Sequence, residues 1–278
     1  MTLFIDSFLE GVRSIDELLK YARIEGDVAE INASDLKHKE LNDLMRECVL
    51  RGARRLILKN VCGQRYIGTR LYFKNNVKVE IEIHGTPGND LGAFLSGHRI
   101  VVYGNAQDGV GNTMDSGEII VHGRAGDVVA MAMRGGKIFI RDNVGYRTAI
   151  HMKEYKERIP LLVIGGTAQD FLGEYMAGGR VVLLGLNLKN EKHKSHYIGT
   201  GMHGGVIYLR GKVEDYQLGK EVGVVEMEQE DWKFLENVIE EFCNHFSEKE
   251  YDKDEILAGN FMKLIPVTKR PYGKIYAY

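Results

Sequence analysis

The sequence predicts a mainly β protein, a right-handed parallel β-helix with coils of about 19 residues, an N-terminal helical cap and a C-terminal helix. The first observation is a repeat, because apolar runs beginning at Ile81, Ile100, Ile119 and Ile138 follow one another at intervals of 19 residues. A short, fixed period indicates stacked units of similar structure. The second observation is that the loops between runs are glycine-rich and lack a helical period. They leave no room for the crossover helices of a doubly wound α/β fold.

Eight strands are predicted in this series, with insertions that lengthen three of the intervals to 24–26 residues. In each strand the first and third residues are apolar, which is typical of a strand that points one face toward a core. The strands begin at Leu56, Ile81, Ile100, Ile119, Ile138, Leu162, Val181 and Ile207.

A column of methionines supports the same alignment, because its intervals follow those of the strands. The column consists of Met114, Met133, Met152, Met176 and Met202. Aligned thioethers are one form of copper site. Flexible side chains that fill the core of the stack are the favoured interpretation.

Composition excludes several classes of function. The chain has 278 residues and a net charge of −2, and its positive charges are dispersed, so no nucleic-acid surface is expected. No apolar stretch approaches about 20 residues and the N-terminus lacks a leader pattern, so we expect no membrane segment and a cytoplasmic location. Cys48, Cys62 and Cys243 are scattered and form neither a disulfide framework nor a cluster motif.

Three regions are predicted along the chain: a helical cap over residues 1–54, the β-helix over 55–212, and a C-terminal helix and tail over 213–278. In the cap, Ser14 and Glu17 form a capping box that begins a helix expected to end at Gly26. A second helix is expected from about Asp35 to Arg51.

The C-terminal region contains an amphipathic helix from about Glu228, with apolar residues such as Leu235, Ile239 and Phe242 on one face. The surface that it could cover is the column of middle strand residues, which is nearly all apolar. This column comprises Ile57, Glu82, Val101, Ile120, Phe139, Val163, Val182 and Tyr208. We expect this helix or the N-terminal cap to cover the column, with a partner subunit as the alternative.

The sequence assigns no catalytic, cofactor-binding or metal-binding residue. The glycine loops lack the phosphate-binding pattern, so their glycines are expected to serve turn geometry. His193, His196 and His203 lie close in an insertion that is either a metal site or, as the neighbouring lysines favour, a solvated loop. His84 and His122 are expected to be surface ladder residues.

Three glycine-rich segments resemble the C-terminal Gly-x-Gly-x-Gly domain of the glutamate synthase large subunit. They are Gly85–Gly97 (GTPGNDLGAFLSG), Gly104–Asn112 (GNAQDGVGN) and Gly173–Gly185 (GEYMAGGRVVLLG). The resemblance covers about residues 54–212, and the segment Phe261–Pro266 is similar to the end of the same domain. The related β-helix subunit of formylmethanofuran dehydrogenase shares the repeat.

This resemblance implies a scaffold between a glutaminase domain and a flavin barrel with an iron–sulfur centre. Residue 2 is threonine where the glutaminase needs cysteine. The expectation is therefore a noncatalytic structural subunit of a glutamate synthase-type oxidoreductase complex in glutamate biosynthesis and nitrogen metabolism. Its partners would be glutaminase and glutamate synthase-type subunits, which alone would carry FMN and iron–sulfur, and self-association stays open. The alternatives are a β-helix subunit of another oxidoreductase complex, similar to formylmethanofuran dehydrogenase, and an enzyme acting in a groove of the solenoid.

Overall fold

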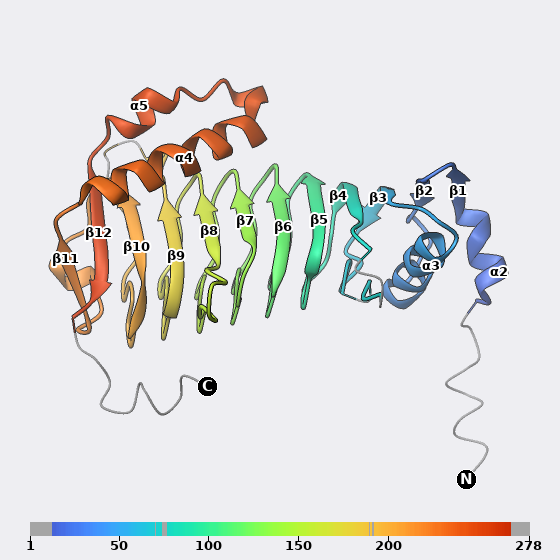
Figure 1. The fold of residues 1–278 in the computed structure, drawn as a ribbon, viewed down its shortest axis with the longest axis horizontal. Coiled ribbons are helices and arrows are strands. Elements are labelled where there is room, and N and C mark those ends of the chain that lie inside the picture. The colour runs from blue at the N-terminus through green and yellow to red at the C-terminus, as the bar shows by residue number, and fades with distance from the viewer. Residues whose placement is uncertain (1–12, 70, 74–76, 189, 191, 268–278) are drawn as a thin grey trace, which may run out of the picture.

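The computed structural model describes residues 13–69, 71–73, 77–188, 190 and 192–267. Its centre is a single 12-stranded sheet in the order β1-β2-β3-β4-β5-β6-β7-β8-β9-β10-β12-β11 (Figure 1). The strands are β1 (Ala22–Glu25), β2 (Val28–Asn32), β3 (Arg55–Cys62), β4 (Glu80–Thr86), β5 (Ser96–Tyr103), β6 (Ser116–Val121), β7 (Lys137–Ile140), β8 (Leu161–Ile164), β9 (Ala177–Leu183), β10 (Gly204–Arg210), β11 (Val222–Val225) and β12 (Phe261–Pro266). The helices are α2 (Ile15–Leu18), η1 (Leu19–Tyr21), α3 (His38–Leu50), η2 (Asp215–Gln217), α4 (Gln229–His245), η3 (Ser247–Lys249) and α5 (Lys253–Leu257).

The predicted parallel β-helix is wrong, because the strands form one open sheet of mixed orientation. Strands β2 to β10 are parallel, whereas β1 pairs antiparallel with β2, and β12 pairs antiparallel with both β10 and β11. Each repeat contributes one strand, and the rest of the repeat folds as turns. In the loop after β6, Val128, Ala130 and Ala132 all have positive φ, of 51°, 57° and 52°. This left-handed conformation is incompatible with a further strand in the loop.

The eight predicted strands are confirmed as β3 to β10, and their register follows the repeat. Leu56 pairs with Ile81, Ile81 with Ile100, and Ile100 with Ile119, and the same column continues to Ile207. The inner face of the sheet packs against the loops that follow each strand. The five methionines of the predicted column are buried in this core. They therefore serve packing, as the favoured interpretation held.

The N-terminal region differs from the prediction in its first half. The capping box of Ser14 and Glu17 is present, but the helix that it begins is short and gives way to the β1–β2 hairpin. Gly26 is in the hairpin turn, with φ of 60°, and does not end a helix. The second predicted helix is confirmed as α3. Its buried face, which includes Met45 and Cys48, joins the inner core of the sheet.

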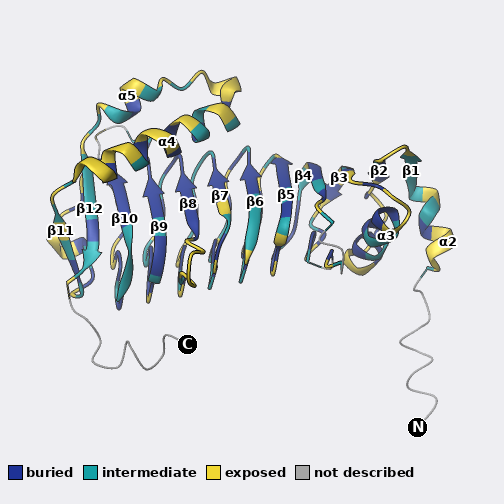
Figure 2. Cartoon of the chain, viewed as in Figure 1, coloured by how far each residue is buried: buried dark blue, intermediate teal, exposed yellow. Residues whose placement is uncertain are grey.

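Helix α4 lies across the outer face of the sheet, as expected for the C-terminal amphipathic helix (Figure 1). Its side chains Leu235, Ile239 and Phe242 form a second core with the middle residues of the strands from Val101 to Tyr208. Burial colouring shows β8 and β9 mostly dark blue and the outward side of α4 mostly yellow (Figure 2). The region boundaries at residues 54 and 212 stay predictions. Within the described residues, no helix is long and apolar enough to cross a membrane.

Candidate functional site: the stacked glycine loops

The loops of successive repeats are joined by a ladder of side chains. An Asp or Asn near the start of one loop accepts a hydrogen bond from a backbone N–H of the next. Asp108 Oδ1 accepts from Asp127 N at 2.9 Å, and Asp127 Oδ1 in turn accepts from Tyr146 N at 2.9 Å. The same kind of bond recurs at three more places. The side-chain oxygens of Asn105, Asn143 and Asp170 accept from the backbone N–H groups of Arg124, Thr167 and His196, respectively. The backbones bond as well, for example Val128 N to Tyr146 O at 2.8 Å.

This ladder explains the regular spacing of glycines within the loops. A Cβ added to Gly126 would overlap Asp108 Oδ1, and one added to Gly145 would overlap Asp127 Oδ1. Glycine therefore leaves the space that the side chain of the preceding repeat occupies. The space around these glycines is filled by carboxylate and amide oxygens, which would repel a phosphate. The expectation that the glycines serve loop geometry agrees with this arrangement.

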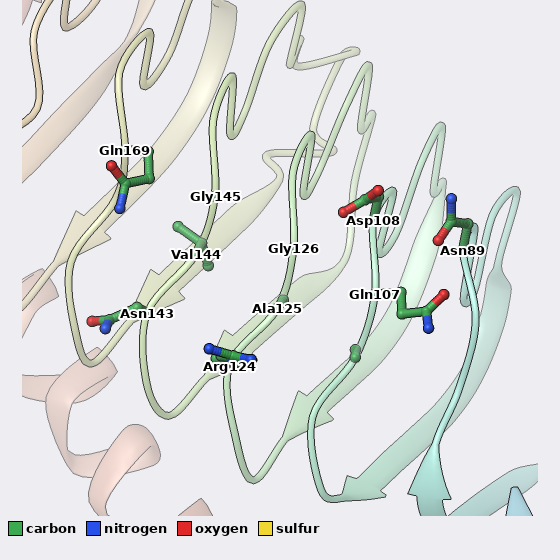
Figure 3. A pocket seen from close by; sticks show the side chains of 11 residues that line it. Asn89, Gln107, Asp108, Arg124, Ala125, Gly126, Asn143, Val144, Gly145 and Gln169 are labelled. Atoms are coloured by element: carbon green, nitrogen blue, oxygen red, sulfur yellow. The ribbon is translucent and has the colours of Figure 1, made fainter. Parts of the chain in front are cut away.

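A shallow groove of about 440 Å³ runs over the loops of five repeats (Figure 3). Its polar side chains are mainly amides. They are Asn89, Gln107, Asp108, Arg124, Asn143 and Gln169. Asp108 is the single carboxylate among the lining residues, and its Oδ1 is already bonded to the next loop. Glycoside hydrolysis commonly uses two carboxylates, so the lining gives no support to the alternative of a groove enzyme.

Farther along the loops, aromatic rings that are exposed or half-buried stack from one repeat to the next. We call Arg147, His151, Phe171, Tyr175 and Tyr197 the aromatic ladder. Phe171 stacks on Tyr197 with ring centroids 4.9 Å apart, and His151 stacks on Tyr175 at 5.4 Å. The Arg147 guanidinium lies 4.8 Å from the centre of the Phe171 ring. Tyr197 is 54% exposed. Tyrosine and arginine in such a cluster are the side chains that commonly contribute most to protein interfaces.

Comparison with known proteins identifies the family. The GXGXG motif family matches residues 39–267. This chain belongs to the GXGXG family. An uncharacterized protein of Methanocaldococcus jannaschii is 49% identical over 251 residues, which cover 88% of this chain and 95% of that relative. The family match confirms the resemblance to the glutamate synthase domain and extends it, because it also includes α4 and all of α3 after His38.

The three histidines of the GXGXG chain's insertion point to different partners. His193 is buried, its Nε2 lies 2.9 Å from Arg210 O, and burial lowers its pKa. His196 is exposed, with Nδ1 3.5 Å from the Asp170 carboxylate, and His203 Nδ1 lies 3.3 Å from Gly201 O. Among the described residues, these histidines do not form a cluster with metal-ligand spacing. The expectation of a solvated loop is wrong for His193, whose carbonyl oxygen accepts a hydrogen bond from buried Gln217.

Other candidate side chains of the GXGXG chain are dispersed as the sequence suggested. His84 stacks on Tyr103 at 5.1 Å, and His122 lies tilted against the same ring at 4.9 Å, which confirms a ladder of rings at the ends of β4, β5 and β6. His84 is exposed and His122 is half-buried. Cys48 is buried, and burial raises its pKa to about 11. The aromatic ladder was missed by sequence reasoning, because Tyr197 follows an insertion that hides its alignment with Phe171. The interval of 26 residues from Phe171 to Tyr197 equals that from Val181 to Ile207, and aligning the loops by the strand intervals would have found the ladder.

Proposed function

We propose that this chain is a noncatalytic subunit of a glutamate synthase-type complex that docks onto separately encoded glutaminase and glutamate synthase chains. The observation that carries the proposal is the GXGXG family match over residues 39–267, because this domain is found in glutamate synthase. FMN and the iron–sulfur centre would then be held by the partner subunits. The proposal places this complex in the cytoplasm.

The geometry supports a scaffold because the loops are held rigidly. Each loop is bonded to its neighbours through backbone groups and through the side-chain ladder, so side chains on the loops have fixed positions. A partner that binds a preorganised surface orders few side chains on association. We propose the aromatic ladder as part of the contact surface, since its rings are already stacked and all of them except the half-buried Phe171 are exposed.

The test is affinity purification of the chain from native cells, with identification of the bound proteins and an assay of glutamine-dependent glutamate synthesis. We expect a glutaminase and a flavoprotein to co-purify, and the activity to disappear when this chain is removed. Recovery of neither protein, together with no activity in the eluate, would contradict the proposal.

A matched pair of variants tests the surface. Tyr197→Ala should weaken capture of the partners, whereas Tyr72→Ala should not, because Tyr72 is 74% exposed and lies on the N-terminal part of the chain. Equal capture by both variants would reject the aromatic ladder as the contact surface while leaving the scaffold role standing. Circular dichroism of both variants controls for folding.

A further inference from the structure

Three possible metal ligands converge where the end of α4 meets the outer face of the sheet. Glu118 comes from β6, and Glu241 and His245 come from α4. His245 Nε2 lies 3.4 Å from Glu118 Oε1 and 3.9 Å from Glu241 Oε1. One ligand atom of each residue lies within 4.8 Å of the other two, and no other such group is found in the described part of the chain.

The fold fixes the positions of these side chains. Residues four apart on a helix share a face, so Glu241 and His245 point together toward the sheet. Phe242, between them in the sequence, is fully buried in the outer core and sets the rotation of the helix. The His245 ring also packs edge-on against Phe139 of β7, at 4.7 Å between ring centroids.

Both carboxylates are held by neighbouring cations. Arg99 Nε donates to Glu118 Oε2 at 2.8 Å, and Lys137 Nζ donates to both oxygens of Glu241, at 2.7 and 2.8 Å. Metal-ligating carboxylates are commonly held by such outer hydrogen bonds. The Arg99 guanidinium favours the ionised form of the Glu118 carboxyl, which is the form that binds a metal.

The imidazole of His245 is the second observation that points to a ligand. Its Nε2 atom is buried and has no hydrogen-bond partner of good geometry in the described structure. A buried polar nitrogen without such a partner is costly. A cation placed between this nitrogen and the two Oε1 atoms would satisfy it.

We propose that Glu118, Glu241 and His245 bind a divalent transition-metal ion such as Zn²⁺ and fasten α4 to the sheet. For zinc bonds of about 2.0–2.2 Å, tetrahedral ligands are about 3.3–3.6 Å apart. The observed 3.4 and 3.9 Å need only a small closure. Water takes the fourth position, because the three side chains are 16–29% exposed.

The charged groups around the site are compatible with the binding of a cation. Arg99 also pairs with Glu80 at 3.0 Å, so the three carboxylates of Glu80, Glu118 and Glu241 surround two cations, Arg99 and Lys137. A neutral imidazole leaves this group with a net negative charge. When the ion binds Oε1 of Glu241, Lys137 keeps its hydrogen bond to Oε2. The inference is independent of the proposed partner complex.

The experiment uses the full chain without a histidine tag, stripped of metal and then titrated with Zn²⁺ near pH 7.5. We expect one equivalent of zinc to remain after gel filtration and the melting temperature to rise. Co²⁺ in the same site should give the visible absorption of a tetrahedral nitrogen–oxygen complex. His245→Gln and Glu241→Gln should each weaken zinc binding by about tenfold or more.

Glu248→Gln is the matched control, because Glu248 also pairs with a histidine, at 3.0 Å from His122 Nδ1, but lacks a third ligand. It should bind zinc like the unaltered chain. Failure of the unaltered chain to retain one equivalent would overturn the proposal, as would undiminished binding by His245→Gln. Glu241→Gln changes a partly exposed helix residue, so it keeps the test valid if His245→Gln does not fold.

Discussion

The two faces of the sheet are both apolar, but they are covered in different ways. The inner face is covered by the loops of the same repeats, so each part of that core is built from residues near in sequence or in the adjacent repeat. The outer face is covered by α4, a segment that follows the whole series of repeats. Each repeat therefore contributes its own part of the inner core, whereas the whole outer core depends on the packing of one helix, α4.

The outer face also shows where its cover ends. Beneath α4 the middle strand residues are apolar, from Val101 to Tyr208. In β3 and β4, beyond this core, the same column holds Ile57 and Glu82, and Glu82 accepts a hydrogen bond from Arg55 at 2.6 Å. The column thus becomes polar at Glu82, next to the last strand of this core, although Ile57 in β3 is apolar and half-buried.

We expect the largest loss of stability from a substitution in the core between α4 and the outer face of the sheet. Phe242→Ala removes a fully buried ring from the core between α4 and the sheet and should cost about 4 kcal/mol of local stability. Because the inner core does not depend on α4, the helix should open while the sheet stays folded. Hydrogen exchange should become faster in α4 and in the residues beneath it. Loss of protection throughout the sheet would show that the two cores are one cooperative unit.

A cavity of similar kind in the core of the inner face should lower the global stability of the protein and not only that of one helix. Ile138→Ala should cost about 3 kcal/mol, because Ile138 is fully buried between β7 and the loops. Neighbouring repeats share this core, so the loss should appear in global urea unfolding and in exchange on both sides of β7. An effect confined to one repeat would break the proposed contrast between the faces.

Glycine substitutions near the strand ends test how closely neighbouring strands pack. Gly85 has φ of 129°, and a Cβ there would overlap the backbone carbonyl of Val61. Gly97 also has positive φ, of 82°, but a Cβ there meets nothing within 4 Å. Gly85→Ala should therefore destabilise the protein by about 2 kcal/mol more than Gly97→Ala, whose cost is conformational strain of about 1 kcal/mol. Equal unfolding free energies for the two variants would contradict the close packing of Gly85 in β4 against Val61 in β3.

The smallest expected effect is the pH dependence of helix docking through Asp231. Burial raises the pKa of Asp231, but hydrogen bonds from Lys263, Tyr208 and the Glu228 backbone outweigh it and lower the pKa. A lowered folded pKa gives stability that is present above the unfolded pKa and is lost as pH falls through the folded value. Asp231→Asn should cost about 2 kcal/mol at pH 7. Its difference from the unaltered chain should shrink in acid, and a constant difference down to the acid transition would refute this assignment.

The sequence predicted the strands and their register because the repeat itself encodes them. Each strand start from Leu56 to Ile207 follows from the spacing of apolar residues, and the structure pairs these residues in one column. The fold class was wrong because left-handed backbone at non-glycine residues such as Val128 and Phe171 has no signature in composition. The β1–β2 hairpin was missed because the capping box at Ser14 favoured a longer helix than packing allows.

The candidate sites were less predictable. The role of the glycines followed from their period, but the side-chain ladder that fills their space needed coordinates. Glu118 and His245 lie far apart in the sequence and meet because α4 packs on the sheet. No spacing rule joins them.

Reversal of strand direction near the sheet edges limits how far the sheet can extend. A stack of parallel repeats with identical ends could add copies without limit, as fibres do. Here the edge strand β1 runs against its neighbour β2, and β12 interrupts the parallel series before β11. Both edge strands have four residues, and Arg23 and Glu25 of β1 form an exposed ion pair. The short and reversed edge strands thus give the sheet a fixed length and disfavour end-to-end polymerisation of the protein.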